Sequence, residues 1–204
     1  LITELIRQWR DHWHQHRKDR DRQYMFVTII TDSGNTLAWH AFINLEAERR
    51  RAYKVLREAK LHGVFSTEVQ HITNFPQRGH GGTDCWHHHC VATTDDPDFE
   101  IEAVAAQLCA SGRLSNIFDF PTVRITPITS LAQLMRCCGY MLKAPAIGKR
   151  LVPHPLIPLA WTFKNVSVRN DVVLRLGEAL SQVEIGQLVH SVGQGKHLLR
   201  PAMK

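Results

Sequence analysis

The sequence of 204 residues lacks both a long apolar run and a start that resembles a leader peptide. No apolar stretch approaches the roughly 20 residues that span a bilayer, so we expect no membrane partner. The start, Leu1-Ile2-Thr3-Glu4, is not a basic end followed by an apolar block, so no secretory signal peptide is expected. Because the chain begins at Leu1 rather than at methionine, we expect it to be a piece of a longer protein.

The sequence also has neither the even number of cysteines expected for a set of disulfides nor an excess of acidic residues. The five cysteines are an odd number, which argues against a secreted disulfide framework and favours a reduced, cytoplasmic setting. Lys and Arg total 25 against 19 Asp and Glu, giving a formal charge of +6. This balance favours a polyanionic partner, most simply nucleic acid.

The hydrophobic pattern predicts an α+β fold. After a helix, the expected elements are strands at 24–31, 64–73, 85–93 and 122–128 and helices at 44–62, 99–108 and 130–143. The order β-α-β-β-α-β is that of a ferredoxin-like, split βαβ antiparallel sheet with helices on one face, followed by a helix that carries Tyr140. The first and third strands are central in that topology.

Three segments are expected along the chain. Residues 1–22 form a basic N-terminal helix, and residues 23–150 form the main domain. Residues 151–204 form a helical appendage, or a linker to a missing domain, because Pro153, Pro155 and Pro158 suggest a linker or an edge segment. Two short helices are expected there, at 171–180 and 183–192.

His87 and His89 are the first candidate ligands. Side chains on a strand alternate between faces, so these two imidazoles point the same way, whereas His88 points towards the core with Trp86 and Cys90. Imidazole nitrogen is a common ligand of divalent transition metals. Two imidazoles on a central strand therefore predict half of a metal site.

Glu68 is the expected third ligand. It lies on the strand that pairs with the histidine strand, among apolar and β-branched residues, where a carboxylate is unusual unless something pairs with it. Two alternatives stay open: the histidines are surface residues of a hairpin, or they form a structural zinc site with Cys85 and Cys90. The cysteine spacing is poor for the zinc site.

Tyr140 is the candidate nucleophile. It lies nearly opposite the apolar stripe of its predicted helix, and Lys143 is its neighbour one turn on. A cation there favours the phenolate or stabilises charge on a phosphate. The alternative is an ordinary surface tyrosine.

Three segments resemble, in order, the motifs of the HUH endonucleases, and among these the rolling-circle replication initiators. They are Phe26-Val27-Thr28-Ile29-Ile30-Thr31, His87-His88-His89 and Tyr140-Met141-Leu142-Lys143. Glu68 is similar to the acidic residue that those initiators place on the neighbouring strand. The middle residue of the histidine motif is usually bulky and apolar, whereas here it is His88. No second tyrosine follows Tyr140, which resembles the single-tyrosine initiators.

The resemblance implies a metal-dependent, site-specific endonuclease and ligase of single-stranded DNA. It would nick a replication origin, such as that of a plasmid, through a 5′-phosphotyrosine at Tyr140, with Lys143 holding the phosphate or the tyrosine. Mg²⁺ or Mn²⁺ would be held by His87, His89 and Glu68. The expected partners are single-stranded DNA or an origin hairpin, with a host helicase and polymerase. Candidates for contacts to the DNA backbone are Arg49, Arg50, Arg51, Arg78, Lys149 and Arg150.

Two other functions stay open at this point. The chain can be a transposase or mobilisation relaxase of the same superfamily, which differs in its DNA target. It can also be a DNA-binding module without catalysis, which differs in forming no covalent bond through Tyr140.

Overall fold

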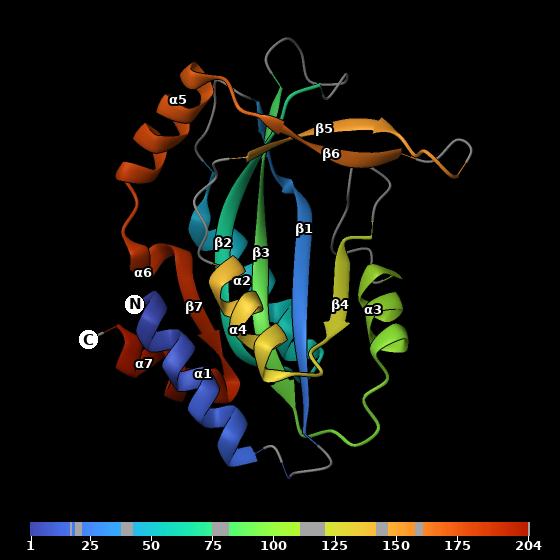
Figure 1. Cartoon of the computed structure of the whole chain (residues 1–204), viewed down its shortest axis with the longest axis vertical. Coiled ribbons are helices and arrows are strands. Elements are labelled where there is room, and N and C mark those ends of the chain that lie inside the picture. Colours follow the sequence, from blue (N-terminus) through green and yellow to red (C-terminus); the bar gives the residue numbers. More distant parts are fainter. Residues whose placement is uncertain are drawn as a thin grey trace.

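The computed structural model describes residues 1–16, 18, 22–37, 43–74, 82–110, 121–141, 147–157 and 161–203, with the backbone alone for 31–37 and 147. Figure 1 shows a curled sheet with helices packed against it. Within these ranges, no helix is both long and apolar enough to cross a membrane.

A mostly antiparallel sheet forms the centre of the molecule. Its strand order is β4-β1-β3-β2-β5-β6, β7 also pairs with β2, and only the β2–β5 pairing is parallel. The chain therefore has a mixed fold of helices and a mostly antiparallel sheet, which agrees with the expected α+β class. The strands are β1 (Gln23–Leu37), β2 (His62–Ile72), β3 (Thr83–Thr94), β4 (Val123–Pro127), β5 (Ile147–Pro153), β6 (Trp161–Ser167) and β7 (Val189–Val192).

Seven described helices accompany the sheet, and a short 3₁₀ turn (Gly193–Gly195) precedes the last one. Two helices begin at side-chain caps: Asn44 accepts a hydrogen bond from the Ala47 amide, and Ser130 accepts one from the Gln133 amide. The helices are α1 (Ile2–His16), α2 (Leu45–Glu58), α3 (Ile101–Ala110), α4 (Leu131–Tyr140), α5 (Asn170–Ser181), α6 (Ile185–Leu188) and α7 (Lys196–Ala202).

Both faces of the sheet are covered. On one face α2 and α3 pack over a core that includes Met25, Val27 and Phe65. On the other face α1, α4 and α7 pack over a second core around Val64 and Val91. The expectation of helices on one face therefore holds for α2 and α3 but not for the whole chain. Both faces of the sheet carry apolar residues, and helices pack on both faces to bury them.

Strand β3 lies in the middle of this arrangement, between β1 and β2 (Figure 1). Every residue of β3 is buried. Neighbouring strands and packed helices hold its backbone from all sides, so it is a rigid platform for functional side chains.

Two strands beyond the expected boundary at 150, β6 and β7, belong to the same sheet. The expected boundary at 150 falls inside β5, and β7 pairs with β2 from Gly63 to Ser66. The helix expected at 171–180 is present as α5. The helix expected at 183–192 is wrong, because α6 ends at Leu188 and the next four residues form β7.

Candidate metal centre and tyrosine

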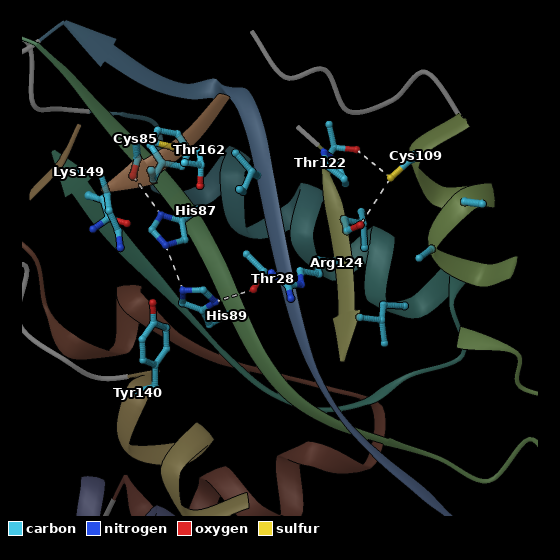
Figure 2. Close-up of a pocket in the computed structure, with 18 of the residues that line it drawn as sticks. Thr28, Cys85, His87, His89, Cys109, Thr122, Arg124, Tyr140, Lys149 and Thr162 are labelled. Carbon is cyan, nitrogen blue, oxygen red and sulfur yellow. Dashed lines mark hydrogen bonds between the residues drawn. The ribbon is translucent and has the colours of Figure 1, made fainter. Parts of the chain in front are cut away.

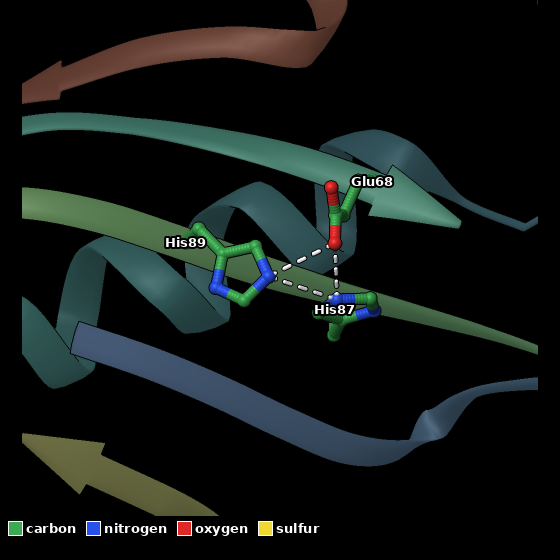
Figure 3. Close-up of side chains that lie close together, drawn as sticks. All are labelled: Glu68, His87 and His89. Atoms are coloured by element: carbon green, nitrogen blue, oxygen red, sulfur yellow. Dashed lines mark hydrogen bonds and ion pairs between the residues drawn. The ribbon is translucent and has the colours of Figure 1, made fainter. Parts of the chain in front are cut away.

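Glu68, His87 and His89 converge at one point on the face of the sheet that α4 covers (Figure 3). Glu68 on β2 is the register partner of His87 on β3, and His89 follows two residues later on the same face. The Glu68 Oε1 atom lies 2.7 Å from His87 Nε2 and 2.9 Å from His89 Nε2, and the two nitrogens are 3.1 Å apart. Strand register thus brings one carboxylate and two imidazoles within reach of a single ion.

The second nitrogen of each imidazole has its own partner. His87 Nδ1 donates to the Cys85 carbonyl at 3.1 Å, and His89 Nδ1 shares a 3.0 Å hydrogen bond with the Thr28 hydroxyl on β1. These bonds fix the ring orientations and direct both Nε2 atoms towards Glu68. Partners of this kind usually orient the imidazoles of metal sites and make them more basic.

Glu68 and His87 stabilise each other's charges. Burial alone would raise the pKa of Glu68, but the hydrogen bonds from His87 and His89 outweigh it and hold that pKa well below its usual range. Burial alone would lower the pKa of His87, but its hydrogen bonds to the Cys85 carbonyl and to Glu68 raise the pKa to about 10. A negative carboxylate therefore faces a positive imidazolium, and a divalent cation would take over the role of that proton.

The donor set fits a divalent metal ion. Two imidazoles and one carboxylate leave positions open for water or substrate, as in catalytic rather than structural sites. Among the described residues, this is the one group of three or more His, Cys, Asp or Glu side chains that could hold an ion. The zinc alternative gains no support, since neither Cys85 nor Cys90 belongs to the group. Burial raises the pKa of the Cys90 thiol, which keeps it protonated.

His88 points away from this group, as expected from strand alternation. Its side chain is 1% exposed, and its Nδ1 shares a 3.0 Å hydrogen bond with the hydroxyl of its register partner Thr67. Its Nε2 lies 3.9 Å from a buried carboxylate oxygen of Glu48 on α2. The ring of Phe65 packs edge-on against it. The predicted core position of His88 is confirmed.

Tyr140 is the last residue of α4, and its ring stands beside the metal centre (Figure 2). The ring centroid lies 5.0 Å from that of His89 and 5.9 Å from that of Phe26, both in edge-on geometry. The end of α4 is tied to β2 by a 2.5 Å hydrogen bond from the Ser66 hydroxyl to the Met141 carbonyl. Figure 2 shows the phenol group directed towards His87 and His89. With 42% of its surface exposed, Tyr140 remains open to a ligand.

A wide cleft connects these groups. Its volume is about 1170 Å³, which exceeds the roughly 300–1,000 Å³ of small-molecule pockets and suits a segment of a polymer. His87, His89 and Tyr140 line it, with Lys149 from β5 and Arg124 from β4. Two cations therefore border the cleft from different strands.

The other predicted cations lie elsewhere. Arg49, Arg50 and Arg51 are on α2, which packs against the opposite face of the sheet, and each pairs with Glu46 or Glu48. Arg150 follows Lys149 on β5 and is exposed. Lys143 and Arg78 are outside the described residues.

Sequence reasoning missed Arg124. It is exposed, its register partner is Thr28, and it has no acidic partner among the described residues. A signal for it was present, since residues 120–170 contain no Asp or Glu at all. A stretch of that length without an acidic residue marks a cationic surface.

Comparison with known proteins found no matching family model, no matching curated protein and no matching solved structure.

Proposed function

We propose that this chain is a metal-dependent endonuclease that nicks single-stranded DNA through a covalent bond to Tyr140. The observation that carries the proposal is the direction of the Tyr140 phenol towards a carboxylate and two imidazoles, in a cleft bordered by Arg124 and Lys149. The strand order β4-β1-β3-β2 also supports the proposed ferredoxin-like core, in which the histidine strand is central. Initiation of rolling-circle replication at an origin is the biological role that the motif resemblance favours.

Glu68, His87 and His89 would hold the ion, Mg²⁺ or Mn²⁺. When bound, such an ion supplies positive charge that polarises a phosphate and orients it. Thr28 and the Cys85 carbonyl keep the two imidazoles in place. The carboxylate is shared by both imidazoles, so loss of Glu68 would leave two buried imidazoles without their counter-charge.

Tyr140 would be the nucleophile. Its phenolic oxygen attacks the phosphorus and loses its proton, the bond from phosphorus to the 3′-oxygen breaks, and that oxygen takes up a proton. The products are a 5′-phosphotyrosine on the protein and a free 3′-hydroxyl. Because the phosphodiester energy is kept in the new bond, the reverse reaction rejoins the strand.

Arg124 and Lys149 would contact phosphates on either side of the reacting one. Both border the cleft, and among the described residues Lys149 Nζ donates to the neutral side chain of Asn165 and has no acidic partner. Their charges are therefore available to a polyanion. A single strand can bend into such a cleft, whereas a duplex is too stiff to follow it.

The test is incubation with a pool of single-stranded oligonucleotides and Mn²⁺, followed by a denaturing gel. We expect a protein–DNA adduct, which peptide mass spectrometry should place on Tyr140. Tyr140→Phe should form no adduct but should still bind the pool. Tyr53→Phe is the matched control, because Tyr53 is 41% exposed on α2, against the other face of the sheet. Efficient cutting of relaxed duplex without an adduct would refute the proposal.

Metal binding can be tested separately by titrating Mn²⁺ and following either heat or the paramagnetic resonance signal. His87→Ala and His89→Ala should each abolish measurable binding. A chelator should stop adduct formation, and added Mn²⁺ should restore it. Adduct formation that persists in the chelator would remove the metal from the proposal.

A further inference from the structure

The acid-free stretch from residue 120 to 170 contributes several of the elements around the cleft. It contains β4, α4, β5 and β6, which are the elements that carry Tyr140 and the cations of the cleft. Arg169 pairs with Asp171 just beyond the stretch, and Glu102 also lines the cleft. Arg124 and Lys149 have no acidic partner among the described residues, so their charges attract a polyanion. The basic residues of the stretch are Arg124, Arg136, Lys143, Lys149, Arg150, Lys164 and Arg169.

Strands β5 and β6 form a two-stranded hairpin whose base is anchored to the sheet. The Asn74 side chain exchanges two 2.8 Å hydrogen bonds with the backbone of Leu151, and the Thr73 amide donates to the Lys149 carbonyl. Beyond this anchor the hairpin runs across the ends of β1–β3 and projects past them (Figure 1). Its position is therefore fixed at the base, next to the metal centre.

The hairpin carries an aromatic line that begins in the cleft. Phe163 lines the cleft and packs against the cluster of Ile72 and Cys85. Trp161 lies two residues before Phe163, at the start of β6, and therefore on the same face of the strand. It is 53% exposed. An indole held in solvent on a strand end presents a flat apolar surface that the fold itself does not use.

The hairpin also carries two like charges opposite each other. Arg150 and Lys164 are register partners on β5 and β6, and both are exposed. Like charges directly across a strand pair destabilise it. The pair lies on the face of the hairpin opposite Phe163 and Trp161, because Lys164 is adjacent to Phe163 on β6. It adds positive charge to the hairpin.

We propose that the β5–β6 hairpin binds the unpaired nucleic-acid strand where it leaves the metal centre. In this arrangement Trp161 stacks on a base, and Phe163 and Lys149, which share its face of the hairpin, border the path from the cleft. Arg150 and Lys164 lie on the opposite face and add to the positive charge that attracts the strand. Combined aromatic and basic side chains are how proteins hold single strands without reading their sequence. The choice of DNA as the strand depends on the proposed function.

The experiment uses Tyr140→Phe protein in a chelator, so that neither cleavage nor the metal affects the measurement. Fluorescence of the protein and anisotropy of a labelled oligo-dT are followed together. Trp161→Ala should weaken binding at least about five-fold, the lower range for loss of one stacked base. Trp161→Phe should keep most of the affinity and lose the quenching of tryptophan fluorescence that oligo-dT causes. Leu156→Ala is the matched control on the same hairpin, 85% exposed but not aromatic, and should bind like the parent.

The outcomes separate this inference from the proposed nicking. Unchanged binding of Trp161→Ala would overturn the hairpin proposal, even if Tyr140 formed an adduct in the cleavage assay. Quenching and weakened binding would support it, even if no adduct formed. A dependence on Trp161 that was stronger for duplex DNA or for anionic vesicles than for oligo-dT would overturn the single-strand assignment.

Discussion

His88→Ala tests whether the two faces of β3 have separate roles. The imidazole is buried, shares a hydrogen bond with Thr67 and packs against Phe65. Removing a buried ring costs about 3–5 kcal/mol, with the lower end suited to a small, polar ring. The Thr67 hydroxyl also loses its hydrogen-bond partner, which destabilises the fold by about 1 kcal/mol. In the opposite direction, the variant no longer has to bury a polar imidazole, which offsets part of the loss. We therefore expect a loss of about 3 kcal/mol in the free energy of unfolding.

For a domain of this size, a loss of about 3 kcal/mol lowers the melting temperature by about 6–12 °C. Differential scanning calorimetry of the metal-free protein measures it, with the exposed His197→Ala as a control that should change little. Mn²⁺ affinity, measured below the new melting temperature, should stay within about two-fold because the ligands lie on the other face. An unchanged melting temperature together with lost Mn²⁺ binding would refute the assignment of His88 to the core and of His87 and His89 to the metal.

Three other substitutions test single contacts of the site. Thr28→Val removes the hydrogen bond to His89 Nδ1 and should weaken Mn²⁺ binding about ten-fold in calorimetric titration. Ser66→Ala frees the end of α4 from β2, so Tyr140 should lose its alignment; we expect roughly ten-fold slower adduct formation on the gel with unchanged Mn²⁺ affinity. Arg124→Ala should weaken oligo-dT binding and reduce the slope of log affinity against log salt by about one, because one phosphate contact is lost.

The clustering of Glu68, His87 and His89 could be anticipated from sequence because it depends on short-range rules. Strand alternation alone places His87 and His89 on one face. The hairpin between the second and third strands makes them neighbours, and this brings Glu68 opposite His87. The same period places His88 in the core. None of these inferences needs to know how distant parts of the chain meet.

The C-terminal part could not be predicted because its pairings are non-local. The prolines after residue 150 suggested a linker, but Pro153 ends β5 beyond the one register pair that β5 forms with β2, so its missing amide interrupts no ladder on that side. Residues 189–192 carry a weak helical pattern, yet they form β7 because β2 offers them hydrogen-bond partners from far away in the sequence. Long-range pairing of this kind overrides local propensity.

The placement of the arginines on α2 shows a second limit of prediction from sequence. Sequence identifies Arg49, Arg50 and Arg51 as a basic cluster, but it does not say which face of the sheet the helix covers. In the structure each pairs with a carboxylate on the same helix, so their charge is largely compensated. The informative pattern was instead a missing residue type, since the acid-free stretch contains Arg124 and Lys149.

The alternation of side chains along β3 makes the geometry of the site depend on the packing of the core. A slip of one residue in the pairing of β2 with β3 would turn His88 towards the cleft and bury His87 and His89 in the core. Trp86 and Cys90 would also leave the core face, where they now pack with residues of α2, α5 and β1. The burial of these side chains therefore stabilises the one register in which Glu68 meets both ligands. The candidate metal centre therefore keeps its geometry through the core itself, because the hydrogen-bond register that forms the core also aligns Glu68, His87 and His89.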